Sequence, residues 1–155
     1  MNNRRNKNRG YQQLRVWQDA IELYALTAGV LRRLPYELKR VGSQGFASSD
    51  SVHRNIAEGY CRRSIKEYLQ FLYIALGSLG ESVSGYNALH AASQISDDDF
   101  EALDSHAYKL ENGLLRLVES IERKKQDGHW IDSLVVKEEK EEEGEEEGEK
   151  DEEME

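Results

Sequence analysis

The sequence predicts an all-α fold, an antiparallel up-down four-helix bundle followed by a disordered acidic C-terminal tail. In three long segments, apolar residues recur at alternating spacings of three and four, the pattern of a helix with one buried face. Residues that stop and start helices separate the segments, and no segment shows the sustained alternation of a strand. Short connections between long helices favour antiparallel neighbours.

We divide the 155 residues into one folded domain and two extensions, because a chain of this length is typical of a single domain. Residues 1–10 are basic and expected to be flexible, and residues 11–126 are expected to form the bundle. Residues 127–155 are expected to be a linker and the tail. From residue 137 onward the chain is almost entirely Glu, Lys, Gly and Asp, and it lacks the apolar surface that folding requires. The apolar stretch 129–136 either docks on the bundle or binds a partner.

The first helix is expected to end before Pro35, the only proline. The second, roughly residues 38–58, contains glycines and serines that lower helix propensity. We still predict a helix there, because the alternative is a loop of about 25 residues inside a compact domain. Gly59 is expected to end it, since glycine tolerates the left-handed backbone of a helix C-terminus. The predicted buried stripes of these two helices are Leu14, Trp17, Ile21, Tyr24, Ala28 and Leu31, and Val41, Gly45, Ser49, Val52 and Ile56.

The last two helices each begin at a predicted capping residue. Ser64 and Glu67 form a capping box, in which the serine hydroxyl accepts from the Glu67 amide. Ser96, followed by three aspartates, repeats this pattern. The predicted stripes are Leu69, Leu72, Leu76, Leu79, Val83 and Tyr86, and Phe100, Leu103, Ala107, Leu110, Leu114, Leu117 and Ile121.

Three glycines inside the third helix, Gly77, Gly80 and Gly85, each cost about 1 kcal/mol relative to alanine. This cost predicts that another helix approaches closely, within the protomer or from another subunit.

The composition argues against several classes of function. A single cysteine, Cys61, permits neither an intramolecular disulfide nor a thiolate cluster, and this fits a reducing cytoplasm. The sequence has no secretory signal and no apolar run long enough to span a membrane. No nucleophile–base pair, metal-ligand set or phosphate loop can be assembled, so we expect no enzyme activity, no metal and no cofactor. Two neighbouring arginines are expected to lower the pKa of the Cys61 thiol if it is exposed.

The charge is unevenly distributed along the chain. Residues 1–66 contain 13 basic and 5 acidic side chains, whereas residues 131–155 contain 3 basic and 14 acidic ones. The net charge of −9 therefore comes largely from the tail. The tail is either a solubilising extension or a mimic of nucleic acid that covers basic residues of the bundle.

A basic turn is the best candidate for a binding site, because arginine presents a planar fork that suits phosphate. The alternative is an ordinary solvated surface whose cations pair with acidic residues of the second half. Tyr60, Tyr68 and Tyr73 either stack on bases or, as we favour, belong to the core or a subunit interface. The turn residues are Arg54, Arg62, Arg63 and Lys66. If the helices pack suitably, we expect four further residues to join them: Arg32, Arg33, Lys39 and Arg40.

The corner between the second and third helices has a structural interpretation. Asn55 and Glu58 are expected to bond turn amides or the arginines Arg62 and Arg63, which would fix the corner. A catalytic pair of Glu58 with His53 is disfavoured, because five residues place the two about 140° apart around a helix. The predicted structural set is Asn55, Glu58, Gly59, Ser64 and Glu67.

A resemblance to known proteins rests on the blocks 55–59, 62–64, 67–68, 71–72, 74–75 and 77–79, together with Glu81. Upstream, Leu14, residues 16–18, Ala20 and residues 34–35 also match. On these residues, over about 11–125, the chain resembles the four-helix-bundle proteins encoded in intervening sequences of bacterial 23S rRNA genes, the S23 family. It also resembles their relatives, the accessory variability determinants of diversity-generating retroelements.

The resemblance implies a ring-like homopentamer without known enzyme activity. For the retroelement relatives it implies a basic surface that contacts nucleic acid and a reverse transcriptase. This chain departs from the pattern in the second helix, where Phe46 and Ala47 replace a basic pair, Asp50 adds an acid and His53 replaces a proline. The long acidic tail is a further departure.

Two hypotheses follow. The first is a non-enzymatic oligomeric scaffold that binds RNA or DNA through the basic turn. The second is a scaffold that organises a partner protein without binding nucleic acid.

Overall fold

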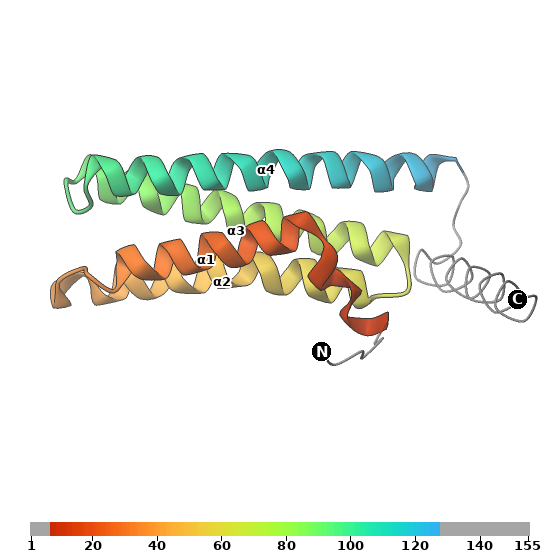
Figure 1. Ribbon diagram of the computed structural model, residues 1–155, viewed down its shortest axis with the longest axis horizontal. Helices are drawn as coiled ribbons and strands as arrows, with labels where there is room; N and C mark the ends of the chain where they lie inside the picture. Colours follow the sequence, from red (N-terminus) through yellow and green to blue (C-terminus); the bar gives the residue numbers. More distant parts are fainter. Residues whose placement is uncertain (1–6, 128–155) are drawn as a thin grey trace, which may run out of the picture.

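The computed structural model describes residues 7–127, which fold into an antiparallel up-down four-helix bundle (Figure 1). The predicted disordered tail and the apolar stretch 129–136 lie outside the described residues, as do residues 1–6 of the predicted flexible N-terminus. The elements in order are η1 (Lys7–Gln13), α1 (Arg15–Leu31), η2 (Tyr36–Leu38), α2 (Lys39–Cys61), α3 (Ile65–Ala91) and α4 (Asp97–Gln126). The 3₁₀ helix η1 extends the folded part four residues ahead of the predicted boundary at residue 11.

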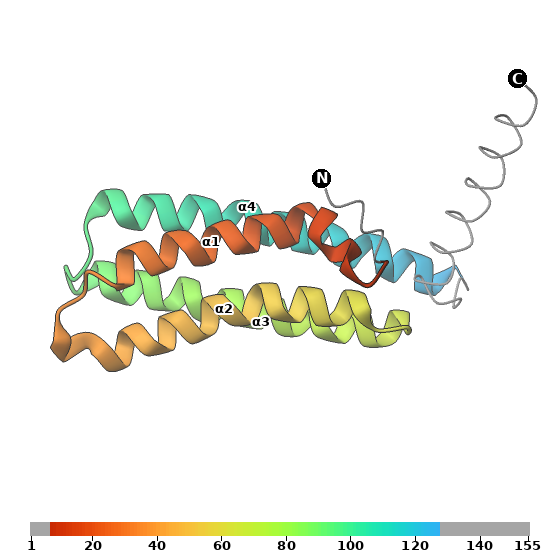
Figure 2. The same ribbon diagram turned by 60° about the horizontal axis from the view of Figure 1, so that its bottom comes forward.

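The long helices pack in the pairs α1–α2, α2–α3, α3–α4 and α4–α1, so that α1 and α3 lie on opposite corners of the bundle (Figure 2). The bundle therefore has two distinct ends. We call the end with the α1–α2 and α3–α4 connections the Pro35 end, and the end with the α2–α3 turn the Arg62 end. The N-terminal η1 and the last turn of α4 also lie at the Arg62 end (Figure 1).

Helix starts and most of the buried faces are as predicted, although Val41 of the predicted α2 stripe is exposed. The hydroxyls of Ser64 and Ser96 accept from the amides of Glu67 and Asp99 at 3.4 Å and 3.1 Å, which satisfies amides that a helix N-terminus leaves without partners. The stripes of α3 and α4 form the core, where the fully buried residues include Leu72, Leu79, Leu103, Leu110 and Leu114.

The buried face of α1 differs from the predicted stripe. Trp17, Ile21 and Tyr24 are only half-buried, because the helix is turned so that Val16, Ala20, Leu23, Thr27 and Val30 face the core. Two residues on this buried face are polar, so the spacing of apolar residues does not reveal it. Asp19 is buried beside Lys109 of α4 at 3.4 Å, and the Thr27 hydroxyl is 2.6 Å from that of Tyr86 in α3.

A seam of hydroxyl groups joins α2 to α3. Ser82 donates to Ser48 at 2.9 Å, and the hydroxyls of Ser51 and Ser78 lie 2.8 Å apart. Short side chains allow the two helices to approach while their polar groups remain hydrogen-bonded. This seam explains the serines that weaken the helix propensity of α2.

The predicted role of Gly59 is wrong, and so is a close approach to the glycines of α3 within the protomer; an approach from another subunit stays a prediction. Gly59 does not end α2, which continues to Cys61; it is buried where a Cβ atom would lie 2.7 Å from the Phe71 Cβ. Conversely, added Cβ atoms on Gly77, Gly80 and Gly85 would have no heavy atom within 4 Å, so no helix of the protomer approaches them closely. The close approach within the protomer lies at Gly59 rather than in α3.

Among residues 7–127, none of the helices combines the length and the apolar character that a membrane span requires.

Candidate nucleic-acid interface

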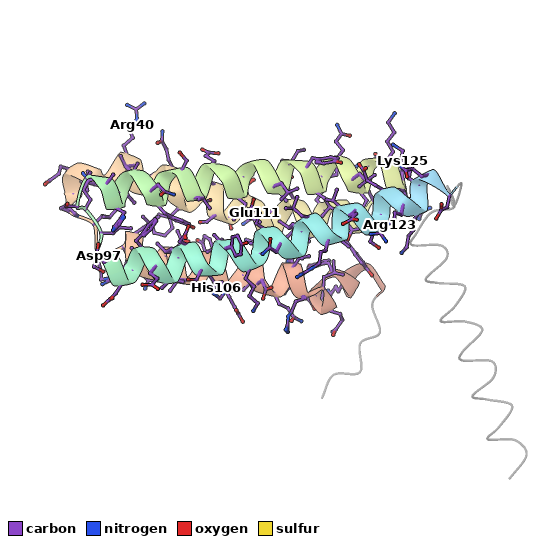
Figure 3. The ribbon with its side chains drawn as sticks, turned by 90° about the horizontal axis from the view of Figure 1, so that it is seen from above. Arg40, Asp97, His106, Glu111, Arg123 and Lys125 are labelled. Carbon is purple, nitrogen blue, oxygen red and sulfur yellow. The ribbon has the colours of Figure 1, made fainter. Side chains whose placement is uncertain are left out.

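The two groups of predicted basic residues lie at opposite ends of the bundle. Arg62, Arg63 and Lys66 occupy the α2–α3 turn, whereas Arg32, Arg33, Lys39 and Arg40 flank the α1–α2 connection. The 23 residues of α2 separate them by about 34 Å. In Figure 3, Arg40 lies at one end of the bundle, and Arg123 and Lys125 of α4 lie at the other. The expectation that the two groups join in one surface is therefore wrong.

At the Pro35 end, three of the four predicted basic residues interact within the protein, whereas the exposed Arg40 has no partner among residues 7–127. Arg33 pairs with Asp99 at 2.9 Å, and the Nε of Arg32 donates to the Ala28 carbonyl at 3.1 Å. The ammonium of Lys39 lies 5.7 Å from the centre of the Tyr36 ring. The three aspartates that open α4 also lie at this end, so its local charge is mixed. Such a surface is a poor attractor for a polyanion.

The α2–α3 turn presents its cations because of its local sequence. The helix α2 ends at Cys61 and Arg62 adopts an extended backbone, with φ −77° and ψ 148°. The Ser64 cap then starts α3 at residue 65, so the turn contains only residues 62–64. Arg62 and Arg63 are exposed in this turn, and Lys66 is exposed in the first turn of α3.

The end of α4 adds cations that were not predicted from the sequence to lie at this site. Arg123, Lys124 and Lys125 form its last turn, and the Tyr73 hydroxyl of α3 donates to Glu122, which fixes this turn beside α3. An antiparallel bundle necessarily places the second turn and the end of the fourth helix at the same end. The predicted topology could therefore have identified the cations of α4 as neighbours of the turn. We define the basic end cluster as Arg62, Arg63, Lys66, Arg123, Lys124 and Lys125.

Ion pairs divide the cluster into engaged and available cations. Arg62 contacts Glu58 at 3.0 Å and lies 4.0 Å from Glu67, and its guanidinium lies over the Phe71 ring. Arg123 pairs with Glu119 at 2.7 Å. Within the described part of the chain, the remaining cations that make no ion pair at this end include Arg63, Lys66 and Lys124. These side chains are free to contact an external anion.

Arg54 lies two helical turns before the basic turn and has a different environment. Its Nε donates to Asp50 at 2.5 Å, and Asp50 also contacts His53 at 2.8 Å. Burial acts to raise the pKa of Asp50, but hydrogen bonds from His53 and Arg54 outweigh it and hold the pKa below its ordinary value. Asp50 therefore remains ionised and retains Arg54, which removes this arginine from the strongest candidates.

The predicted structural corner is confirmed only in part. Glu58 does pair with Arg62, and the Ser64–Glu67 cap is present. Asn55, however, donates to the carbonyl and hydroxyl of Ser51 at 2.8 Å and 2.9 Å, so it bonds within α2 rather than to the turn. The hydroxyl seam determines this orientation, because Ser51 also bonds across to α3.

The thiol and the aromatic side chains near the turn were also candidates for a functional role. The pKa of the exposed Cys61 thiol is raised by partial burial, opposite to the lowering expected from the neighbouring arginines. Tyr60 and Tyr68 are buried in the core, as favoured from the sequence, whereas Tyr73 is half-exposed. Among residues 7–127 no three His, Cys, Asp or Glu side chains lie together as a metal site would require.

Comparison with known proteins defines the family. A model of the 23S rRNA-intervening sequence protein family matches residues 12–116. The chain belongs to this family. The bundle is also similar to a solved structure of a protein with unknown function from the S23 ribosomal protein family of Bacteroides thetaiotaomicron VPI-5482, with a TM-score of 0.63 and 20% sequence identity. That match covers 67% of this chain and 95% of the other, and it shows the shared fold. No curated protein matches the chain.

The region matched to the 23S rRNA-intervening sequence protein family includes the α2–α3 turn but ends within α4. The cations at 123–125 therefore lie beyond the family match.

Proposed function

We propose that this member of the 23S rRNA-intervening sequence protein family is a non-enzymatic, oligomeric scaffold that binds RNA or DNA through its basic end cluster. The observation that carries the proposal is the grouping of exposed cations at the Arg62 end, where Arg63, Lys66 and Lys124 make no ion pair within residues 7–127. Exposed cations at the Pro35 end also lack ion pairs, but they share that end with the three aspartates that open α4. The family name links its members to rRNA genes, which supports a nucleic-acid partner. The proposed settings are an rRNA intervening sequence, or a retroelement in which a reverse transcriptase is a further partner.

The cluster matches the chemistry of a phosphate backbone. Arginine offers a planar fork of donors to phosphate oxygens, and lysine supplies a mobile point charge. Affinity of this kind depends on the number of cations and falls steeply with salt. Tyr60 and Tyr68, the aromatic residues nearest the turn in sequence, are buried and cannot stack on bases. The proposal is therefore for backbone contacts with little sequence preference.

Assembly would multiply these contacts, and the outer face of α3 is the proposed assembly surface. Between Tyr68 and Ala91 the helix contains one charged residue, Glu81, although much of this stretch is exposed. A groove of about 480 Å³ between α2 and α3 continues the surface, and half of its lining residues are small, including Gly45, Gly85 and Ala88. An exposed helix face normally carries more charge. We propose that another copy of the chain covers it, with a pentamer as the assembly that the family resemblance implies.

A charge placed on this face tests the proposed assembly. We expect Ala88→Glu to convert the oligomer to a monomer without lowering the melting temperature of the protomer, because Ala88 is exposed and the added carboxylate can be hydrated. Native mass spectrometry measures the mass of the assembly. Ser120→Glu, at an exposed position of α4, is the matched control and should leave the oligomer intact. A monomeric wild-type protein, or an oligomer unaffected by Ala88→Glu, would refute the assembly.

Single substitutions test the assignment of the cations. We expect Arg63→Ala to weaken binding of a labelled RNA about fivefold at low salt, whereas Arg54→Ala changes it less than about twofold, because Asp50 already engages Arg54. Fluorescence anisotropy with single-stranded RNA and with duplex DNA of matched length measures both variants and distinguishes the two ligands. Equal losses for Arg63→Ala and Arg54→Ala would contradict the assignment.

A scaffold for a partner protein is the second candidate, and the uncharged face of α3 is the observation that favours it. In that case a different protein covers the face. Purification from the native host separates the candidates: a bound protein that resists nuclease treatment favours this one, and RNA that co-purifies favours the first.

A further inference from the structure

The described part of the chain ends at the basic end cluster, on the N-terminal side of the acidic segment. The helix ends at Gln126, and Asp127 forms its C-terminal cap at the Arg62 end (Figure 1). Asp127, the last described residue, is therefore two to four positions after Arg123, Lys124 and Lys125. The position follows from the described helix alone.

The charges on the two sides of this junction are complementary. Residues 128–155 contain 14 acidic and 3 basic side chains, whereas residues 7–127 contain 16 of each. The folded part is thus neutral overall, and the excess negative charge of the chain lies beyond α4. At the Arg62 end, Arg63, Lys66 and Lys124 make no ion pair with any residue between 7 and 127.

The charges at the Pro35 end are less complementary to the acidic segment. There Arg33 is already paired with Asp99, and Asp97 and Asp98 add negative charge at the start of α4. The last turn of α4 instead presents three consecutive basic residues, although Glu122 and Asp127 flank them.

Chain length permits the contact. Glu138, where the continuous acidic run begins, is 11 residues beyond Asp127 and can therefore lie up to about 36 Å away from it. The whole cluster lies closer than this limit, since Lys66 is within about two helical turns of the α3 residue that contacts Glu122. A segment joined to the surface that it binds acts at an effective concentration on the order of 1 mM, so weak individual contacts suffice.

We propose that residues 137–155 occupy the basic end cluster and compete with nucleic acid for it. Carboxylates and phosphate oxygens use the same guanidinium and ammonium donors, so the two ligands exclude one another. The competition rests on the proposed function, whereas the contact between tail and cluster does not. The consequence is selectivity: a ligand with few phosphates is kept off the cluster, and one that makes many contacts displaces the tail.

The first test compares three full-length proteins. In the neutral-tail variant, every acidic residue from Glu138 to Glu155 is changed to its amide, and in the control the order of residues 137–155 is scrambled with the charge kept. We expect the neutral-tail variant to bind a labelled single-stranded RNA about tenfold more tightly at about 50 mM salt, with the difference lost by about 500 mM. The scrambled tail should behave as wild type, because the contact is electrostatic. Equal affinities of all three would overturn the competition.

The second test needs no nucleic acid. A carbodiimide links a carboxylate to an amine that it touches, and mass spectrometry identifies the linked residues. We expect tail carboxylates to link to Lys66 and Lys124 in the wild-type protein, with Lys39 at the Pro35 end as the internal control. Links to Lys39 as frequent as those to Lys66 would overturn the contact, even if RNA binds. Links confined to Lys66 and Lys124, with no RNA bound by any variant, would support the contact and remove the proposed function instead.

Discussion

Reversing the charge of Arg62, Arg63 and Lys66 to glutamate together is expected to weaken RNA binding at least about 100-fold at about 50 mM salt. Each substitution removes a donor to phosphate and adds a repulsive charge at the α2–α3 turn. With a single-stranded ligand, the slope of log affinity against log salt should fall by about 0.7 for each phosphate that the variant no longer neutralises. Fluorescence anisotropy over a salt series measures both quantities.

The matched control reverses Arg32, Lys39 and Arg40 at the Pro35 end. It changes the net charge by the same amount about 34 Å away, where screening weakens its effect, so a loss below about threefold is expected. The reversed turn should remain folded, because its exposed ion pairs of Arg62 contribute no more than about 1 kcal/mol each. Circular dichroism verifies this. Equal losses in the two triple variants would mean that net charge, rather than the basic end cluster, governs binding.

Replacing Gly59 with alanine is expected to lower the free energy of unfolding by about 1–3 kcal/mol. The added Cβ would lie 2.7 Å from the Phe71 Cβ and 3.3 Å from the Tyr68 carbonyl oxygen. Neither atom is the end of a flexible side chain, so relief requires that α2 and α3 move apart. Chemical denaturation of the purified variant measures the loss.

Gly77→Ala is the matched control, and we expect it to raise the free energy of unfolding rather than lower it. Nothing lies within 4 Å of its added Cβ, so the protomer should gain about 0.5–1 kcal/mol from the better helix former. If another copy packs on this face, the same substitution should weaken assembly while it stabilises the protomer. A Gly59→Ala variant as stable as wild type would mean that the two helices are farther apart than the structure places them.

The sequence allowed the fold to be predicted because its signals are local. The caps at Ser64 and Ser96 depend on residues three positions away, and the stripes of α3 and α4 depend on the period of one helix. The face of α1 was misjudged because Asp19 and Thr27 are buried there with partners from α4 and α3. Gly59 was misjudged for the same reason, since its role comes from Phe71, twelve residues away in another helix.

The candidate site was only partly predictable. The cations of the turn are adjacent in sequence and were identified, but their separation from Arg40 and their proximity to Lys124 depend on how the helices are arranged. Which cations remain available depends on pairs such as Arg54 with Asp50 and Arg62 with Glu58, and these follow from side-chain geometry. A count of basic residues cannot separate engaged cations from available ones.

The most direct test of the central claim is to map where nucleic acid contacts the full-length protein. Ultraviolet cross-linking to a single-stranded RNA, followed by mass spectrometry, identifies the linked peptides. The account predicts that they contain residues 62–66 or 123–125. Cross-links concentrated at residues 32–40, or none above background at low salt, would contradict it.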